Sequence, residues 1–420
     1  LEKSPKVTDF LYKALRVLAW LIFSTLLLFI TLALALQITT VQNWVIDKVT
    51  GYLNKNSSFT TEIGEIKLNW WDALELNQLS IRDEKDSLMI GADRAHVDFA
   101  LLSLIPPGDP TIDFIRLEKA KVQLLTHSGD SSMNINRWVV EINELLGAKS
   151  SSTTKTKFYI SAVELRQSEF SLINFNTEPI SAGMDYNRLR FAELSGNATN
   201  FRIEGSQIGI DLKMLSGVEL NSGLQIRELK TLLTYDPKFL ELDRLSLRTD
   251  RSHIKEYLRF DLIGPKGFGQ FLDQVKITAR MEETKINVSD LNILVSAIPQ
   301  IEDEVYLSGE IIGTVSDLKS EEFLIRIGEK TALFGSFYLD GLPDFEKTYM
   351  NISLKNSVIS ARDLAPYLPK ELQATLNKFK LIRLDADFAG LPTRFTTNGS
   401  FKTGIGNLEG RVNFDQVKGK

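Results

Sequence analysis

Apolar residues alternate with polar ones over most of the chain after Ser58, and this period of two is typical of β-strands with one buried face. The run Ile208, Ile210, Leu212 and Met214 is one clear example. The alternating apolar residues that are candidates for one continuous face are Phe158, Ile160, Val163, Leu165, Phe170, Leu172, Ile208, Ile210, Leu212, Phe323, Ile325, Ile327, Leu333, Phe337, Leu339, Met350, Ile352 and Leu354. The pattern predicts a mainly β fold.

Glycines and a change of phase indicate where the predicted sheet bends. Glycine inside a strand lowers strand propensity but lets a sheet curve or coil. The glycines inside strand-like runs include Gly309, Gly313, Gly335, Gly399 and Gly410. The apolar phase slips between Ile160 and Val163, which predicts a β-bulge there. We therefore expect a curved, mostly antiparallel sheet.

Helical patterns are few and short after the first sixty residues. Residues 136–146 carry one apolar face that includes Trp138, and Gly147 is a plausible stop. A second helix is predicted from Ser289 to just before Pro299, and a third over residues 361–378, interrupted by two prolines. The stretch from residue 147 to 156 is polar and aperiodic, which indicates a boundary between two regions.

The N-terminal pattern is different, because residues 17–36 read VLAWLIFSTLLLFITLALAL without a charge. A helix of this length covers about 30 Å, the thickness of a bilayer core. Four basic residues precede the run, so the positive-inside rule places the N-terminus in the cytoplasm and the rest across the membrane. A cleaved signal peptide is the alternative, since residues 33–35 resemble a cleavage site, but its apolar region is usually only about 7 to 15 residues long. We expect one retained span, with Trp20 and Trp44 as membrane-interface candidates.

An amphipathic helix is predicted directly after the run. Val41, Trp44, Val45, Val49 and Leu53 fall at helical spacing on one face. This face could lie on the membrane surface with Trp44 at the level of the headgroups, or it could cap the end of the β body. The sequence does not separate the two.

The balance of strands and helices raises the question of what covers the apolar face of the sheet. Helices able to cover a sheet of this extent are scarce in the sequence. Such a face must close on itself, meet a second sheet, or hold something apolar. A closed sandwich and a ligand-filled groove give the same alternation, so both stay open.

Composition narrows the classes of function. The chain has 420 residues, a formal charge of −5 and interspersed charges of both signs, which gives no electrostatic footprint for nucleic acid. It has no cysteine, so disulfides, thiolate metal sites and cysteine nucleophiles are excluded. Absence of cysteine suits an oxidising compartment.

Constellations for catalysis are missing from the sequence. His96, His127 and His253 are far apart and in no zinc-binding spacing, and no phosphate loop or nucleophile elbow occurs. The glycine-rich stretch at residues 264–269 lies between strand-like runs with no helix predicted after it, so it is interpreted as a turn. We assign no catalytic, cofactor-binding or metal-binding residues and do not expect an enzyme.

Several segments resemble a known family. They include VQNWVIDKVTGYLNK after the apolar run, GDSSMNINRWV before the first predicted short helix, and GSFYLDGLPDFEKTYMNISLKNSVISARDLAPYLP further on. The chain resembles the AsmA-like family along nearly its whole length, and within it the TamB branch of the Bacteroidetes type. Ser131 stands where this family usually has the glycine of a DG-x-x-N turn.

The resemblance implies an inner-membrane anchor followed by a long U-shaped β-groove, or β-taco, with an apolar interior. In this family the groove crosses the periplasm toward an Omp85-class, TamA-like outer-membrane barrel, and the chain would be the N-terminal portion of a longer protein. The expected organisation is residues 1–16 cytoplasmic, 17–36 transmembrane, 37–57 juxtamembrane helix, 58–148 N-terminal β region, 149–156 linker and 157–420 groove.

Three functions are compatible with these expectations. The first is a conduit in which acyl chains of phospholipids lie against the apolar face. The second is an assembly factor that presents outer-membrane proteins to the barrel through strand edges. The third is an anchored structural solenoid with a closed core. No nucleotide-binding motif is present, so any energy would come from a partner.

Overall fold

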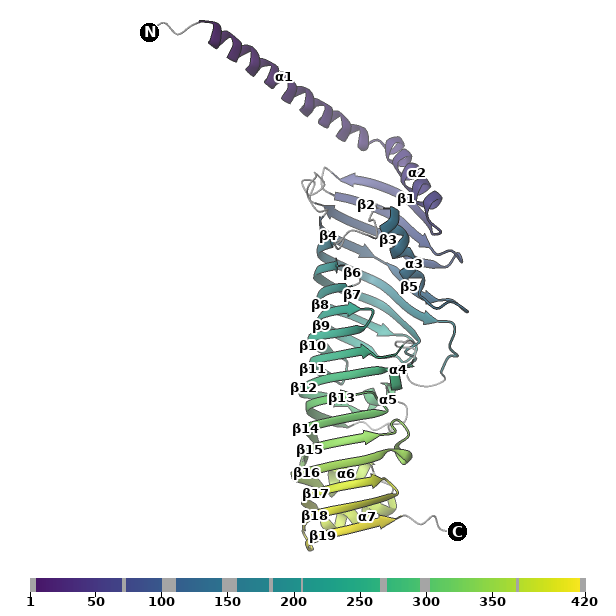
Figure 1. The fold of residues 1–420 in the computed structure, drawn as a ribbon, viewed down its shortest axis with the longest axis vertical. Coiled ribbons are helices and arrows are strands. Elements are labelled where there is room, and N and C mark those ends of the chain that lie inside the picture. The colour runs from purple at the N-terminus through teal and green to yellow at the C-terminus, as the bar shows by residue number, and fades with distance from the viewer. Residues whose placement is uncertain are drawn as a thin grey trace.

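The computed structural model shows one long, curved β-sheet with two helices extending from its N-terminal end (Figure 1). It describes residues 5–69, 73–99, 111–145, 157–180, 184–204, 207–264, 270–294, 303–367 and 370–415. The mainly β class and the curved, mostly antiparallel sheet predicted from the sequence are confirmed.

The helices of the described residues are short, except for the first two. They are α1 (Pro5–Leu36), α2 (Thr39–Asn56), α3 (Asn134–Leu145), α4 (Phe271–Gln274), α5 (Val288–Leu294), α6 (Ala361–Leu364) and α7 (Lys370–Phe379), with 3-10 turns η3 (Phe345–Lys347) and η4 (Ala365–Tyr367). The predicted helices at residues 136–146 and 289–298 are confirmed as far as these residues are described, to Leu145 and Leu294, and the predicted helix at 361–378 is divided into α6, η4 and α7.

The strands form a single 19-stranded sheet. They are β1 (Thr60–Asn69), β2 (Ala73–Arg82), β3 (Leu88–Phe99), β4 (Thr111–Glu118), β5 (Lys121–Thr126), β6 (Lys157–Asn174), β7 (Arg188–Glu204), β8 (Gln207–Glu219), β9 (Gln225–Asp236), β10 (Phe239–Arg248), β11 (His253–Leu262), β12 (Val275–Asn287), β13 (Glu304–Gly313), β14 (Asp317–Ile327), β15 (Thr331–Asp340), β16 (Tyr349–Ser360), β17 (Leu381–Leu391), β18 (Arg394–Thr403) and β19 (Gly406–Asp415).

From β6 to β19 each strand pairs antiparallel with the next in sequence. At the N-terminal end, β4 and β5 share the place between β3 and β6 and run parallel to β6. Parallel neighbours need a crossover, and α3 lies in it. This parallel pairing was not predicted, because period two is the same in both kinds of sheet. The predicted linker at residues 149–156 lies outside the described residues.

The strands bend at register shifts near their middles, visible along the left side of the sheet (Figure 1). The register shifts between Met281 and Thr284 in β12, and between Leu354 and Ser357 in β16. Residues with left-handed backbone lie in these shifts, such as Glu283 (φ 45°) and Asn356 (φ 47°). Such bulges add a residue to one strand and turn it more sharply.

Buried hydroxyl groups supply the hydrogen bonds that the bulges interrupt. The N–H of Lys255 donates to Thr284 Oγ1 (3.1 Å), and the N–H of Phe334 donates to Ser357 Oγ (3.0 Å). Both hydroxyl side chains are fully buried. Burying an N–H without a hydrogen-bond partner lowers the stability of the fold. The hydroxyls of Thr284 and Ser357 avoid this loss at the bends.

The predicted role of glycine in the bends is confirmed at Gly335. A Cβ there would lie 1.8 Å from the carbonyl oxygen of Ser353 on the neighbouring strand. Gly309 has φ of 129°, a backbone conformation that favours glycine.

The end of the sheet at β1 is covered by α2. Ile46 is 7% exposed, Asn54 Nδ2 donates to the carbonyl of Thr61, and the N–H of Thr61 donates to Asn54 Oδ1. The helix α2 thus covers β1, but not with the whole predicted apolar face, because Trp44 and Val49 of that face are exposed. The other side of α2 stays exposed, including Trp44 and Tyr52.

At the same end, α3 packs on the sheet. Its Ile135 and Trp138 contact a buried cluster of Phe59, Ile81 and Met89. The N-terminal part of the sheet thus has a core between a helix and the strands, whereas the core cluster of β14 to β17, which includes Phe323, Leu354 and Leu384, lies among strands alone.

The helices α1 and α4 differ from what the sequence predicts. Residues 17–36 are helical, but the helix α1 begins earlier, at Pro5. Judged on the described residues, no helix combines the length and the apolarity required to cross a bilayer. The expectation that no helix follows residues 264–269 is wrong, since α4 begins at Phe271; its four residues are too few to produce a helical pattern in the sequence.

A carboxylate cluster joins α3 to the β2–β3 turn. Asp83 accepts from the N–H groups of Lys85 (3.0 Å) and Ser87 (2.9 Å) and from Asn134 Nδ2 (3.1 Å), while His127 Nε2 lies 2.7 Å away. A carboxylate only accepts, so the imidazole proton is on Nε2. Burial by itself would raise the pKa of Asp83, but the hydrogen bonds from these groups outweigh it and the pKa is lowered.

We predict that Asp83 makes this end of the protein acid-sensitive. Because its folded pKa is below the unfolded value, its stabilising contribution is present above the unfolded value of about 3.9 and is lost as pH falls through the folded pKa. Asp83→Asn should lower the free energy of unfolding by about 1 to 3 kcal/mol at pH 7, and the difference from wild type should shrink below about pH 4. Urea denaturation across pH measures this, and a pH-independent difference would contradict it.

We predict a second stability effect at a bend. Ser357→Ala removes the acceptor of Phe334 N–H and should cost about 1 to 3 kcal/mol, with faster amide exchange in β15 and β16. The control Ser400→Ala makes the same chemical change on the other face and should stay within about 0.5 kcal/mol. Equal effects of the two changes would show that the bend does not need its hydroxyl.

Candidate functional site

One face of the sheet is apolar across many strands. Residues paired directly between neighbouring strands point to the same face. One row of such pairs from β8 to β13 is Ile210, Leu233, Leu242, Leu258, Ala279 and Ile311. Further rows continue it through β14, β15 and β16, as in the row Leu307, Ile325 and Leu333. We call this side the apolar face.

The candidate residues on β14, β15 and β16 belong to this face. Phe323 pairs with Gly309 and Gly335, Phe337 pairs with Ile352, and Leu339 pairs with Met350. The same face includes the candidates that lie an even number of positions from these residues in the same strands, which are Ile325, Ile327, Leu333 and Leu354.

The candidate residues on β6 and β8 also belong to it, although the phase slips. Leu212 pairs with Ala198, which pairs with Val163, while Phe158 pairs with Ile203, which pairs with Ile208. The ladder omits a pair between Ser161 and Asn200, and Asn200 has φ of 55°. This irregularity lies at the predicted bulge and keeps Ile160 and Val163 on one side.

A second shift in β6, between Leu165 and Ser168, was not predicted. It lies at Gln167, whose φ is 48°. Leu165 pairs with Gly196, and Ser168 pairs with Leu194. Gly196 and Leu194 are two residues apart in β7 and share a face, so Leu165 and Ser168 share it too. Phe170 and Leu172 follow Ser168 at intervals of two and therefore stay on the apolar face.

Met214 does not follow the alternation that the sequence suggested. The register between β7 and β8 shifts, so Met214 pairs with Asn197 instead of continuing after Leu212. Asn197 pairs in turn with Glu164, which hydrogen-bonds Arg116 on the other side of the sheet. Met214 is 44% exposed there.

The apolar face is only half-buried. Ile160, Phe323 and Leu354 are buried, and the other candidate residues whose side chains are described keep part of their surface exposed; the side chain of Phe158 lies outside the description. No second sheet packs on this face, because all described strands belong to one sheet. A sandwich of two separate sheets is therefore absent from the described residues, and apolar residues of the one sheet pack on one another instead, as around Phe323, Leu354 and Leu384.

Aromatic contacts across the strand connections show that the sheet is folded lengthwise. Because strands alternate in direction, their connections form two rows. The first rim consists of the β6–β7, β8–β9, β10–β11 and β12–β13 connections, and the second rim of the β7–β8, β9–β10, β11–β12 and β13–β14 connections. Tyr186 of the first rim stacks on Phe271 of the second, with ring centroids 5.1 Å apart. Phe271 in turn contacts Phe260, which lies on the apolar face. The apolar face is thus the inside of a groove.

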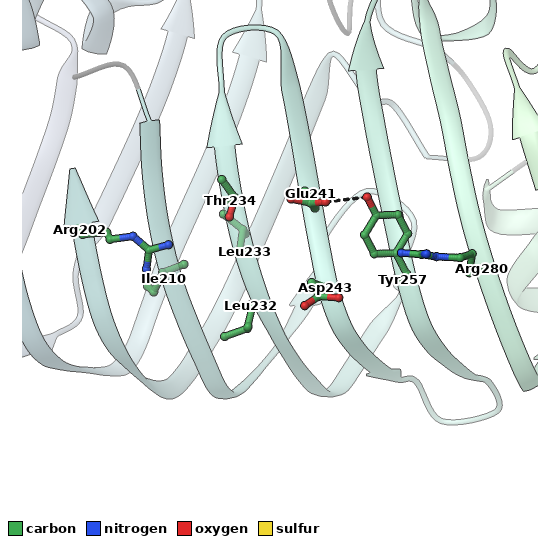
Figure 2. A pocket seen from close by; sticks show the side chains of 9 residues that line it. All are labelled: Arg202, Ile210, Leu232, Leu233, Thr234, Glu241, Asp243, Tyr257 and Arg280. Carbon is green, nitrogen blue, oxygen red and sulfur yellow. Dashed lines mark hydrogen bonds between the residues drawn. The ribbon is translucent and has the colours of Figure 1, made fainter. Parts of the chain in front are cut away.

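The outer face is polar. The hydroxyl of Tyr257 donates to Glu241 (2.6 Å), and Arg280 covers the ring of Tyr257 (Figure 2). Arg259 lies 3.5 Å from Glu241 on the same face. Burial, followed by the hydrogen bond to Glu241, raises the pKa of Tyr257. A hollow of about 390 Å³ lies over these strands and is lined mostly by outer-face residues such as Arg202 and Asp243 (Figure 2). Its charged lining does not suit an acyl chain.

Sequence reasoning missed groove residues on β9 to β13 and β17 to β18. Leu233, Leu258, Ile311, Phe388 and Phe401 lie on the apolar face by pairing or by contact with its core. Register shifts divide the alternation of β9 to β12 into short runs, whereas β17 pairs with β18 without a shift and alternates from Ile382 to Phe388.

The groups that could perform chemistry are separated in space. His96 contacts Asp98, His127 contacts Asp83, and His253 contacts Ser246. Within the described ranges, no three side chains of His, Asp or Glu are grouped to hold a metal ion.

Known proteins add no guide to this site. Comparison of the chain with protein-family models, with curated proteins and with solved structures gives no match.

Proposed function

We propose that the protein carries phospholipids along the apolar groove, from an inner membrane toward an outer-membrane barrel. The observation that carries this proposal is the half-buried apolar face, which runs over many strands without a second sheet to cover it. An apolar face of this extent is unusual in a soluble monomer unless it binds something apolar.

The groove suits acyl chains better than one specific ligand. Each buried CH₂ group favours binding by about 0.8 kcal/mol, so an apolar strip holds lipids without shaped pockets. Rows such as Ile210 and Leu233, then Ile325 and Leu333, repeat with similar chemistry along the sheet. Similar affinity at each level lets a lipid move from one to the next, with its headgroup at the open mouth.

We propose that α1 anchors the protein in the inner membrane with the body in the periplasm. Residues 17–36 carry no charge, and large apolar side chains there, such as Leu21 and Leu28, are exposed. Trp20 (62% exposed) and Trp44 (59% exposed) are the interface candidates. On α2, Trp44 and Tyr52 share the exposed side with Lys48 and Lys55, a combination that suits lipid headgroups.

The second candidate function is an assembly factor that acts through strand edges. An exposed edge can pair with a strand of another protein, as an assembly factor would require. The TamA-like barrel would be the partner in both functions.

We predict that a charge inside the groove abolishes lipid binding. Ile210→Glu places a carboxylate on the apolar face, whereas the matched control Met214→Glu places it four residues later on the outer face. Native mass spectrometry of the full chain, purified in detergent, should show several diacyl phospholipids for wild type and Met214→Glu, and a loss for Ile210→Glu.

The same measurement separates the alternatives. A folded wild-type chain without lipid would contradict the lipid function and favour the assembly factor. Unfolding of Ile210→Glu in circular dichroism would favour a closed structural solenoid, because an unpaired buried charge costs several kcal/mol. Equal lipid loss in both variants would show that the faces are wrongly assigned.

We also predict that residues 1–36 determine membrane attachment. The full chain expressed in a bacterium should stay in the membrane pellet after alkaline carbonate, and protease should reach the body in spheroplasts but not in intact cells. A chain without these residues should leave the pellet. Pelleting that persists after the deletion would assign attachment to α2 or the body.

A further inference from the structure

The two rims of the groove meet at one level of the sheet. Tyr186 lies before β7 on the first rim, and Phe271 lies in α4 on the second. Their rings are nearly parallel, 5° apart, and the Phe271 ring also lies 5.8 Å from that of Phe260 inside the groove. We call the Tyr186–Phe271 pair the rim bridge. Its level is that of β11 and β12, since Phe260 belongs to β11.

The bridge has a firm base on the first rim. The N–H of Met184 donates to the carbonyl of Ile293 in α5 (2.8 Å). Asp290 of α5 accepts from the hydroxyls of Thr249 and Ser252, both at 2.6 Å, which fixes α5 to the β10–β11 connection. Met184 is itself buried.

The base on the second rim is also fixed. The N–H of Ile263 donates to the carbonyl of Gln274 (3.0 Å), and the N–H of Ser316 donates to that of Leu272 (3.2 Å). Both sides of the bridge are therefore held by hydrogen bonds to neighbouring connections. The contact between the two rims consists of aromatic stacking, which separates more readily than a hydrogen-bonded strand.

This arrangement has a consequence for a lipid in the groove. Its acyl chains can lie on the apolar face under the bridge, but its charged headgroup must stay at the mouth, because burying an unpaired charge is strongly unfavourable. The stacked rings occupy the mouth at this level. A headgroup can pass only if the rings separate.

Resting on the proposed lipid function, we propose that the rim bridge is a gate on the lipid path, closed when Tyr186 stacks on Phe271 and opened for each headgroup that passes. The strands before it, β6 to β10, form the membrane-side compartment of the groove. The strands after it, β13 to β19, form the far compartment.

The test uses the absence of cysteine from the chain. In the full chain, Tyr186→Cys and Phe271→Cys together give a thiol pair across the mouth, which a short cleavable bis-maleimide joins. The matched control is a Leu272→Cys and Ser316→Cys pair, which the same reagent joins within the second rim. Each protein also carries benzoylphenylalanine at Leu165 or Phe388, on the two sides of the bridge.

The proteins are placed by α1 in vesicles of labelled phosphatidylethanolamine and phosphatidylglycerol, so that lipid enters from the membrane side. After irradiation, the chain with the joined bridge should keep lipid adducts at residue 165 and lose them at residue 388. Cleaving the linker should restore them. The control pair should give adducts at both positions, and Tyr186→Ala should bring lipid to residue 388 faster than wild type.

The outcomes separate the gate from the proposed function. Adducts at both positions despite a joined bridge would overturn the gate and leave lipid carriage intact. No adduct at either position in the unmodified chain would overturn lipid carriage itself. Failure of the thiols to join would show that the rims do not meet here, which also overturns the gate.

Discussion

Main-chain hydrogen bonding between consecutive strands is the interaction on which the rest of this structure depends. From β6 onward each strand satisfies its donors and acceptors on the next strand in sequence, so the sheet grows in one direction without a second sheet. A body built in this way is stabilised by neighbour contacts, as in other repeat proteins. Its length is set by the number of strands, and its cross-section by how each strand bends.

The bends turn this ladder into a groove. A bulge near the middle of a strand leaves backbone groups without partners, and Thr284 and Ser357 supply hydroxyls at those points. Glycines such as Gly335 give the room that a side chain would take from the neighbouring carbonyl. Polar and small residues at the bend thus allow two apolar arms to face each other, with the charged pairs around Glu241 and Arg259 left outside.

The two ends and the mouth of the groove are treated differently. At the N-terminal end, α2 covers β1 and α3 fills the apolar face with Ile135 and Trp138, which gives an ordinary closed core. Beyond β6 the apolar face is half-exposed, and the first and second rims meet at Tyr186 and Phe271. The covered end beside α1, the half-exposed face beyond it and the bridged mouth are the features that support the proposed lipid path.

Period two determined the β class, and the phase slip between Ile160 and Val163 marked the irregularity at Ser161 and Asn200, because side-chain burial is a local property of a strand. The same periodicity placed the candidate residues on one face wherever a strand has no bulge. It failed at Met214, where a register shift set by the neighbouring strand turns the side chain outward.

Only the tertiary structure decided the rest: the parallel pairing of β4 and β5 with β6, the single open sheet, and the meeting of Tyr186 with Phe271. Each of these joins residues far apart in sequence. Alternation of apolar and polar residues predicts that a strand has an apolar face, but it does not predict what packs against that face.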